Sequence, residues 1–178
     1  MTLFIGGSRA VTRLNEYLRA RLDDFIQRGC TIFVGDANGA DKAVQQHFSE
    51  RGYSQVVVYC MDRCRNNVGG WPIKQISRPG GTRDFAYYAV KDKAMAEDAK
   101  CGMMLWDGES KGTLNNIQNL IAAGKKTLVY FSPEKAFHKL ESIGDLTALM
   151  ARCDQALMVT AQRQIAKAKP DRQPLFQP

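Results

Sequence analysis

The sequence predicts an α/β domain, a Rossmann-like three-layer sandwich with a five-stranded parallel sheet. Short runs rich in β-branched and apolar residues alternate five times with longer segments whose apolar residues recur at helical spacing. The chain has 178 residues, enough for one domain with a buried core. Strands that alternate with helices are expected to be parallel, because each crossover returns the chain to the same end of the sheet.

The first half of the chain supplies three of the expected strands. Apolar runs place them at residues 3–6, 31–34 and 55–60. The intervening segments have apolar residues every three to four positions, which predicts one helix that starts near Val11 and ends near Gly29, and a second that ends at Gly52.

The second half begins with an interruption. Residues 61–82 are rich in Gly and Pro and predict a long irregular loop. The alternation then resumes with a helix over 85–99, a strand over 102–106, a helix that ends at Gly124 and a strand over 126–131. From Pro133 onward we expect only pieces of helix, and the prolines after Lys169 disfavour regular structure.

The net charge of +7 at pH 7 is unevenly distributed. We expect a single domain over residues 1–160, followed by a basic C-terminal tail over residues 161–178. The loop over residues 61–83 contains one acidic residue, Asp62, and five basic residues, which are Arg63, Arg65, Lys74, Arg78 and Arg83. The tail contains one acidic residue, Asp171, and four basic residues, which are Arg163, Lys167, Lys169 and Arg172. Such segments either contact phosphates or nucleic acid, or only keep the surface solvated.

Several function classes are disfavoured by composition. No apolar run approaches the roughly 20 residues of a membrane helix, and no basic leader precedes the first strand, so we expect a cytoplasmic protein without a membrane partner. The five cysteines are odd in number, and most lie in or beside apolar strands, as reduced buried thiols do. Cys60 and Cys64 lack a second pair at metal-site spacing, so we expect no metal and no cofactor.

Three strand-to-helix loops have a composition suited to anions. Glycines let the backbone approach a ligand, and exposed N–H groups at a helix start favour negative charge. Because parallel strands end at one edge of the sheet, the loops are expected to meet there. The expected ligand-binding residues are Gly7, Ser8, Arg9, Gly35, Asp36, Ala37, Gly39, Asp41, Trp106, Asp107, Ser110, Lys111, Gly112, Thr113 and Asn116. For any one of these loops, turn formation and helix capping are the better explanation, whereas three such loops at one edge of the sheet favour a binding site.

The loop motifs resemble a known superfamily. The run GDANGAD at residues 35–41 resembles the GxAxGxD element of the SLOG superfamily, which includes DprA proteins and LOG phosphoribohydrolases. The run WDGESKGT at residues 106–113 resembles the second half of that fold and, more distantly, nucleoside deoxyribosyltransferases. The run KDKAM at residues 91–95 resembles small stand-alone SLOG proteins of bacteria and phages. The resemblance implies a nucleotide-binding domain, often in a dimer.

One position departs from the LOG pattern. The glutamate that takes part in N-glycosidic cleavage in LOG enzymes falls on Asn116, and an amide cannot act as a general base. If the protein is an enzyme, the candidate catalytic residues are Asp92 and Asp107, whose carboxylates would stabilise an oxocarbenium-like charge. Asp92 is otherwise a helix-surface residue, and Asp107 a turn residue.

Three functions follow, in order of preference. The first is binding of a nucleotide-derived small molecule, as a sensor or processing module. The second is hydrolysis or transfer at an N-glycosidic bond. The third is single-stranded DNA binding, from the DprA resemblance and the basic segments, in which Trp71 either stacks on a base or pins its loop.

Oligomeric state stays open at this level. A homodimer would use an apolar helix face, whereas the same residues would otherwise cover the sheet. These residues are Leu146, Leu149, Met150, Leu157 and Met158.

Overall fold

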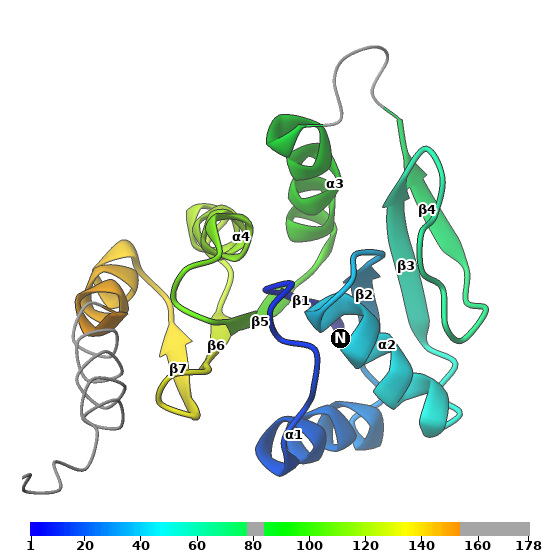
Figure 1. The fold of residues 1–178 in the computed structure, drawn as a ribbon, viewed down its shortest axis with the longest axis horizontal. Coiled ribbons are helices and arrows are strands. Elements are labelled where there is room, and N and C mark those ends of the chain that lie inside the picture. Colours follow the sequence, from blue (N-terminus) through cyan, green and yellow to red (C-terminus); the bar gives the residue numbers. More distant parts are fainter. Residues whose placement is uncertain (78–83, 154–178) are drawn as a thin grey trace, which may run out of the picture.

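The computed structural model describes residues 1–77 and 84–153. Its centre is a seven-stranded sheet in the order β4-β3-β2-β1-β5-β6-β7 (Figure 1). The strands are β1 Thr2–Gly7, β2 Thr31–Gly35, β3 Val56–Met61, β4 Ile73–Ile76, β5 Cys101–Trp106, β6 Thr127–Phe131 and β7 Ala136–Leu140. The helices are α1 Glu16–Gln27, α2 Ala40–Glu50, α3 Phe85–Asp98 and α4 Lys111–Ala122, and residues 143–153 are also helical.

The α/β class and the five expected parallel strands are confirmed, but the count of five is wrong. β1, β2, β3, β5 and β6 correspond to the expected strands, and all pair in parallel. β4 lies inside the segment expected to be an irregular loop, and it pairs in parallel with β3. It is a mostly exposed edge strand, so only one neighbour orders it and its sequence IKQI contains no apolar run.

β7 lies where pieces of helix were expected. It returns antiparallel beside β6 through a tight turn in which Lys135 has φ 53°. Its residues are mostly half-buried, and a strand with such partial burial gives no continuous apolar run. The two missed strands are therefore the two edges of the sheet, where burial leaves the weakest pattern in the sequence.

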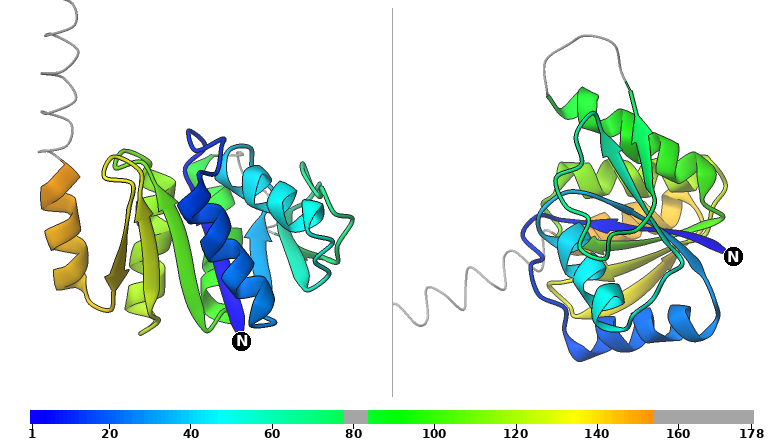
Figure 2. Two further views of the ribbon diagram at one scale, coloured as in Figure 1. Left: turned by 90° about the horizontal axis from the view of Figure 1, so that it is seen from below. Right: turned by 90° about the vertical axis from the view of Figure 1, so that its right-hand side faces the viewer.

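Helices cover both faces of the sheet, which produces three layers. α1 and α2 pack on one face through Leu22 and Phe48, whereas α3 and α4 pack on the other through Met95 and Leu120 (Figures 1 and 2). α1 begins later than expected because Asn15 caps it, with Oδ1 accepting from the Leu18 N–H at 3.0 Å.

The C-terminal described helix covers the sheet. Leu146 and Leu149 are buried in the same core as α3 and α4, whereas Met150 is exposed. Leu157, Met158 and the basic tail 161–178 lie outside the described residues. Within residues 1–77 and 84–153, no helix has the length and hydropathy that crossing a membrane requires.

The strand order reverses between β1 and β5. From β1 the chain proceeds outward through β2, β3 and β4, and then crosses back to place β5 beside β1, with Leu3 opposite Cys101. In open α/β sheets, the crevice outside the carboxyl ends of the strands at such a reversal is where ligands bind. The left view of Figure 2 shows the loop after β1 at the opposite edge of the sheet from the N-terminus.

Candidate functional site

A pocket of about 590 Å³ lies at this reversal point. The loops after β1, β2 and β5 contribute to its wall, together with α3 and one residue of the loop after β3. Its lining residues are Phe4, Gly6, Gly7, Ser8, Arg9, Ala37, Asp41, Arg65, Asp84, Tyr88, Ala89, Lys91, Asp92, Met95, Asp107, Glu109, Ser110, Gly112, Thr113 and Asn116. The volume is within the range of small-molecule sites in proteins.

The pocket gathers most of the residues expected from sequence. Eleven of them line it: Gly7, Ser8, Arg9, Ala37, Asp41, Asp92, Asp107, Ser110, Gly112, Thr113 and Asn116. Five do not line it: Gly35, Asp36, Gly39, Trp106 and Lys111.

Two of these five residues, a glycine and a tryptophan, have structural roles. Gly39 has φ +84°, and a Cβ there would lie 2.4 Å from the backbone of Arg9, so it lets the first two loops touch. Trp106 is buried in the core beside Phe131, with ring centroids 5.8 Å apart.

Asp107 fills the anion-binding position of its own loop. Its Oδ1 accepts from the backbone N–H groups of Glu109 and Ser110 at 3.1 and 2.8 Å, and its Oδ2 accepts from the Ser8 hydroxyl. Burial raises the pKa of Asp107, but these donors outweigh it and hold the pKa below its usual value. The N–H groups that the sequence suggested for a phosphate are therefore already occupied by a carboxylate.

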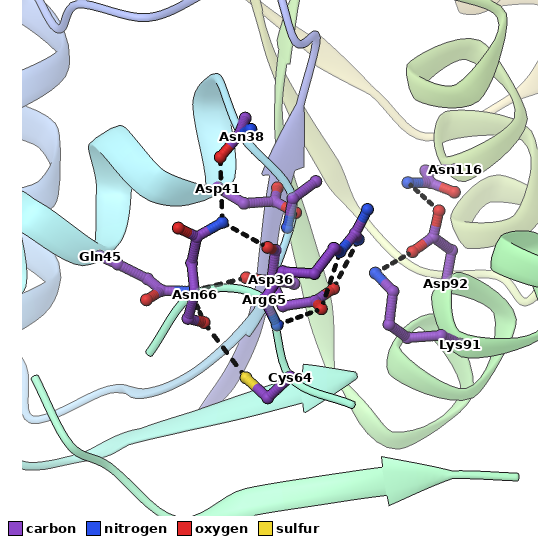
Figure 3. A network of polar contacts seen from close by, with 12 residues as sticks. Asp36, Asn38, Asp41, Gln45, Cys64, Arg65, Asn66, Lys91, Asp92 and Asn116 are labelled. Atoms are coloured by element: carbon purple, nitrogen blue, oxygen red, sulfur yellow. Dashed lines mark hydrogen bonds and ion pairs between the residues drawn. The ribbon is translucent and has the colours of Figure 1, made fainter. Parts of the chain in front are cut away.

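Asp36 fills the second loop in a similar way. It is 1% exposed, and its carboxylate accepts from the Arg65 guanidinium at 2.7 and 3.0 Å and from the Arg65 backbone N–H at 3.1 Å (Figure 3). Burial raises its pKa, yet the hydrogen bonds from Arg65 lower it below the usual value. Asn66 adds a 2.7 Å bond to the Asp36 carbonyl, so the loop after β3 is fixed to the loop after β2.

Arg65 also separates two cavities. Its guanidinium carbon lies 4.8 Å from the centre of the Tyr88 ring, and both residues line the pocket as well as a neighbouring cavity of about 360 Å³. Asp36 belongs to the wall of that second cavity.

A buried ammonium lies beneath the pocket. Lys91 is 3% exposed, and its Nζ donates to Asp92 Oδ1 at 2.7 Å (Figure 3). Burial lowers the pKa of Lys91, but Asp92 and Asp41 outweigh burial and raise it, so the side chain is a cation. Asp41 is buried as well, and desolvation raises its pKa to about 6 in spite of Lys91.

Asn116 joins this cluster from α4. Its Nδ2 donates to Asp92 Oδ2 at 3.4 Å, a long bond. Its Oδ1 is buried and has no hydrogen-bond partner among the described residues, although the residue lines the pocket. A buried acceptor without a donor carries a desolvation cost, which a hydroxyl or amino group of a ligand would relieve.

Arg9 differs from the other two cations of the wall. Lys91 and Arg65 are paired with carboxylates, whereas Arg9 is exposed and has no ion pair within the described part of the chain. Arg9 lines the pocket and can therefore pair with an anionic group of a ligand.

Sequence reasoning missed the importance of Lys91, Arg65 and Tyr88. Lys91 appeared only within the KDKAM run, Arg65 appeared only as part of a basic loop, and Tyr88 was not singled out. A signal for Lys91 was present: it stands four residues from both Tyr87 and Met95, on the face of the helix that is buried.

Trp71 pins its loop. The side chain is buried against the α1–α2 core, and its Nε1 donates to the Tyr53 carbonyl at 2.8 Å. Of the two roles considered from sequence, the structure supports anchoring.

Comparisons with known proteins bear on the fold. No protein-family model and no curated protein matches this sequence. DNA processing protein A from Helicobacter pylori, whose structure was described for its single-stranded DNA binding mode, is similar in structure, with 13% sequence identity and a TM-score of 0.55. The match covers 72% of this chain and 64% of that one, so the chain spans less than two thirds of the neighbour's length. The similarity supports an α/β fold shared with DprA, and the narrower assignment to small stand-alone SLOG proteins stays a prediction.

Proposed function

We propose that the pocket binds a nucleotide or a nucleotide-derived molecule, for which the protein acts as a sensor or processing module. The position of the pocket is the observation that carries this proposal. A cavity of about 590 Å³ opens where the strand order reverses, at the carboxyl edge where α/β sheets bind such ligands.

The chemistry of the wall supports the same proposal. Arg9, which has no ion pair within residues 1–77 and 84–153, offers a positive charge for a phosphate, and Gly112 in the first turn of α4 also lines the pocket. Asp92 and Asn116 offer acceptors for the hydroxyl and amino groups of a sugar or base. A wall that holds both a cation and acceptors fits a ligand with both a phosphate and a polar ring system.

Isothermal calorimetry of the full chain tests this proposal. The titrants are nucleoside mono-, di- and triphosphates, ADP-ribose and cyclic dinucleotides. We expect at least one to bind, and Asp92→Asn to weaken it by tenfold or more, because a wall acceptor loses its charge. Glu97→Gln, an exposed change elsewhere on α3, is the matched control. Absence of heat from every titrant at millimolar concentration would refute the proposal.

An N-glycosidic hydrolase or transferase is the second candidate. The specific observation that favours it is Asp92, a carboxylate in the pocket wall with a lysine on one oxygen. Asp107 is a weaker candidate, since Ser8 and two backbone N–H groups already use it. Incubation with nucleoside monophosphates and NAD, followed by chromatography for free base, tests the activity. Base release that is equally fast in Asp92→Ala would remove Asp92 from the mechanism.

Single-stranded DNA binding is the third candidate, which the structural neighbour favours. Two cations of the basic segment are already paired, Arg65 with Asp36 and Lys74 with Asp98. A DNA complex would therefore depend on Arg63, on the tail, and on Arg78 and Arg83, which lie outside the described residues. Its affinity should fall steeply with salt and further on Arg63→Gln or deletion after Lys169. An affinity that is insensitive to all three would exclude this electrostatic mode.

A further inference from the structure

We propose that Asp92 and Asn116 form a subsite for the vicinal hydroxyls of a sugar, and that Lys91 is the positioning residue of this subsite. The inference rests on the proposed function and deepens it, because it names the part of the ligand that this wall recognises. It predicts preference for a ribose-containing ligand over its 2′-deoxy counterpart.

One carboxylate oxygen of Asp92 stays available to accept a hydrogen bond from a ligand. Lys91 donates to Oδ1 of Asp92 at 2.7 Å, and among the described residues Oδ2 has only the 3.4 Å contact from Asn116. Lys91 is almost fully buried, so its ammonium cannot turn to solvent and holds the carboxylate in one orientation. One oxygen of Asp92 thus remains as an acceptor on the pocket wall.

The orientation of the Asn116 side chain is fixed by its contact with Asp92. A carboxylate accepts hydrogen bonds and donates none, so Asn116 must turn its NH₂ group toward Asp92. Its carbonyl oxygen then faces away from Asp92, and it is this atom that is buried without a partner within the described residues. This atom itself is buried, so a ligand donor reaches it once the side chain shifts toward the pocket. The site therefore lacks a donor at Asn116 Oδ1.

The acceptors of Asp92 and Asn116 determine which ligand group fits beside them. Two acceptors separated by one amide group require two neighbouring donors, and a pair of hydroxyls on adjacent sugar carbons provides them. A phosphate provides only acceptors and would meet both atoms unfavourably. The carboxyl group of Asp41, which interacts electrostatically with Lys91, also lines the pocket and adds to the preference for donors. A neutral hydroxyl-bearing group fits this side of the pocket.

The position of Lys91 explains two further residues. A Cβ on Gly35 would lie 2.3 Å from Asp41 Oδ2 and 2.8 Å from Lys91 Nζ, so glycine at this position leaves the space that the cluster occupies. The charges of Asp41 and Asp36 also raise the pKa of Lys91, and Asp41 has the larger effect of the two. The motif GDANGAD therefore supports the buried lysine in addition to forming a loop.

Paired titrations test the subsite. The full chain is titrated with the four ribonucleoside 5′-monophosphates and with their four 2′-deoxy counterparts. We expect the tightest ribonucleotide to bind at least tenfold more tightly than its deoxy form, because the deoxy form leaves a buried acceptor unpaired. Equal affinity within each pair overturns the inference and leaves the proposed function standing. Absence of binding in both series overturns the two together.

Variants separate recognition from folding. Asn116→Leu should reduce the ribose preference to near unity while the deoxy ligand still binds, and Gln118→Leu, exposed on the same helix, should keep the preference. Lys91→Met should abolish the preference and Lys91→Arg should restore part of it. If Lys91→Met lowers the affinity for both sugars by the same factor, Lys91 has only a structural role and the positioning claim fails. Circular dichroism spectra and melting curves confirm that each variant folds.

Discussion

Gly35 shows at the scale of one residue how a loop glycine can serve packing instead of ligand approach. It does not line the pocket, and the atoms nearest to a Cβ at this position would belong to Asp41 and Lys91. We expect Gly35→Ala to lower the free energy of unfolding by about 1–3 kcal/mol, because its methyl group must displace the buried side chains of Asp41 and Lys91. Urea denaturation measures the change. Gly144→Ala, where the nearest atom is 3.6 Å away, should leave stability within about 0.5 kcal/mol.

Asp41 makes stability depend on pH. Its pKa in the folded protein is about 6, above the ordinary value of 3.8, so the folded state binds the proton more tightly than the unfolded state does. The stabilisation from this proton is complete below the ordinary pKa and is lost as the pH rises through about 6. Between pH 5 and pH 7.5, wild type should therefore lose about 1 kcal/mol relative to Asp41→Asn. Urea curves of both proteins at the two pH values measure this difference, and a constant difference would contradict the assignment.

The sequence pointed to 11 of the 20 residues that line the pocket. Small and polar residues that follow predicted strands indicate the carboxyl edge of a parallel sheet, and they do so without knowledge of the rest of the fold. This pattern pointed to Ser8, Asp107 and Thr113. Lys91 and Tyr88 were missed because they come from a helix, where only three-dimensional packing shows which face meets the loops. The role of Asp107 was also hidden, since its partner Ser8 is 99 positions away in the sequence.

At the scale of elements, each strand was predictable to the extent that it is buried. The five inner strands have continuous apolar runs because helices cover both faces, whereas β4 and β7 border solvent and were missed. Helix starts were less predictable, since α1 begins at the asparagine cap and not at the first apolar residue.

The start of α4 depends on Ser110. Its hydroxyl accepts from the Thr113 N–H at 3.3 Å and from the Thr113 hydroxyl at 3.0 Å. Ser110→Ala should lower the free energy of unfolding by about 1 kcal/mol, since a helix N–H loses its partner. Ser110→Thr should retain most of the stability, and chemical denaturation compares the two. An alanine variant as stable as wild type would show that water replaces the cap.

At the scale of the whole molecule, ligand binding should appear as added stability. A ligand at 100 times its dissociation constant raises the free energy of unfolding by about 2.7 kcal/mol if it binds only the folded state. For a chain of this size, this corresponds to a rise of roughly 5–10 °C in melting temperature. Thermal melts with the tightest titrant from calorimetry measure the shift. A shift far below this range would mean that the ligand also binds unfolded chain.

The pairing of β1 with β5 joins residues that are almost a hundred positions apart in the sequence, so they are synthesised at different times. Contacts of such long range form late in folding, because the loop between them must close first. β1, β2 and β3 can assemble as soon as they leave the ribosome, but the hydrogen bond from Ser8 to Asp107 cannot form until β5 follows. A growing chain would therefore be unable to capture the ligand until β5 takes its place beside β1, and the ligand would bind assembled molecules without guiding their folding.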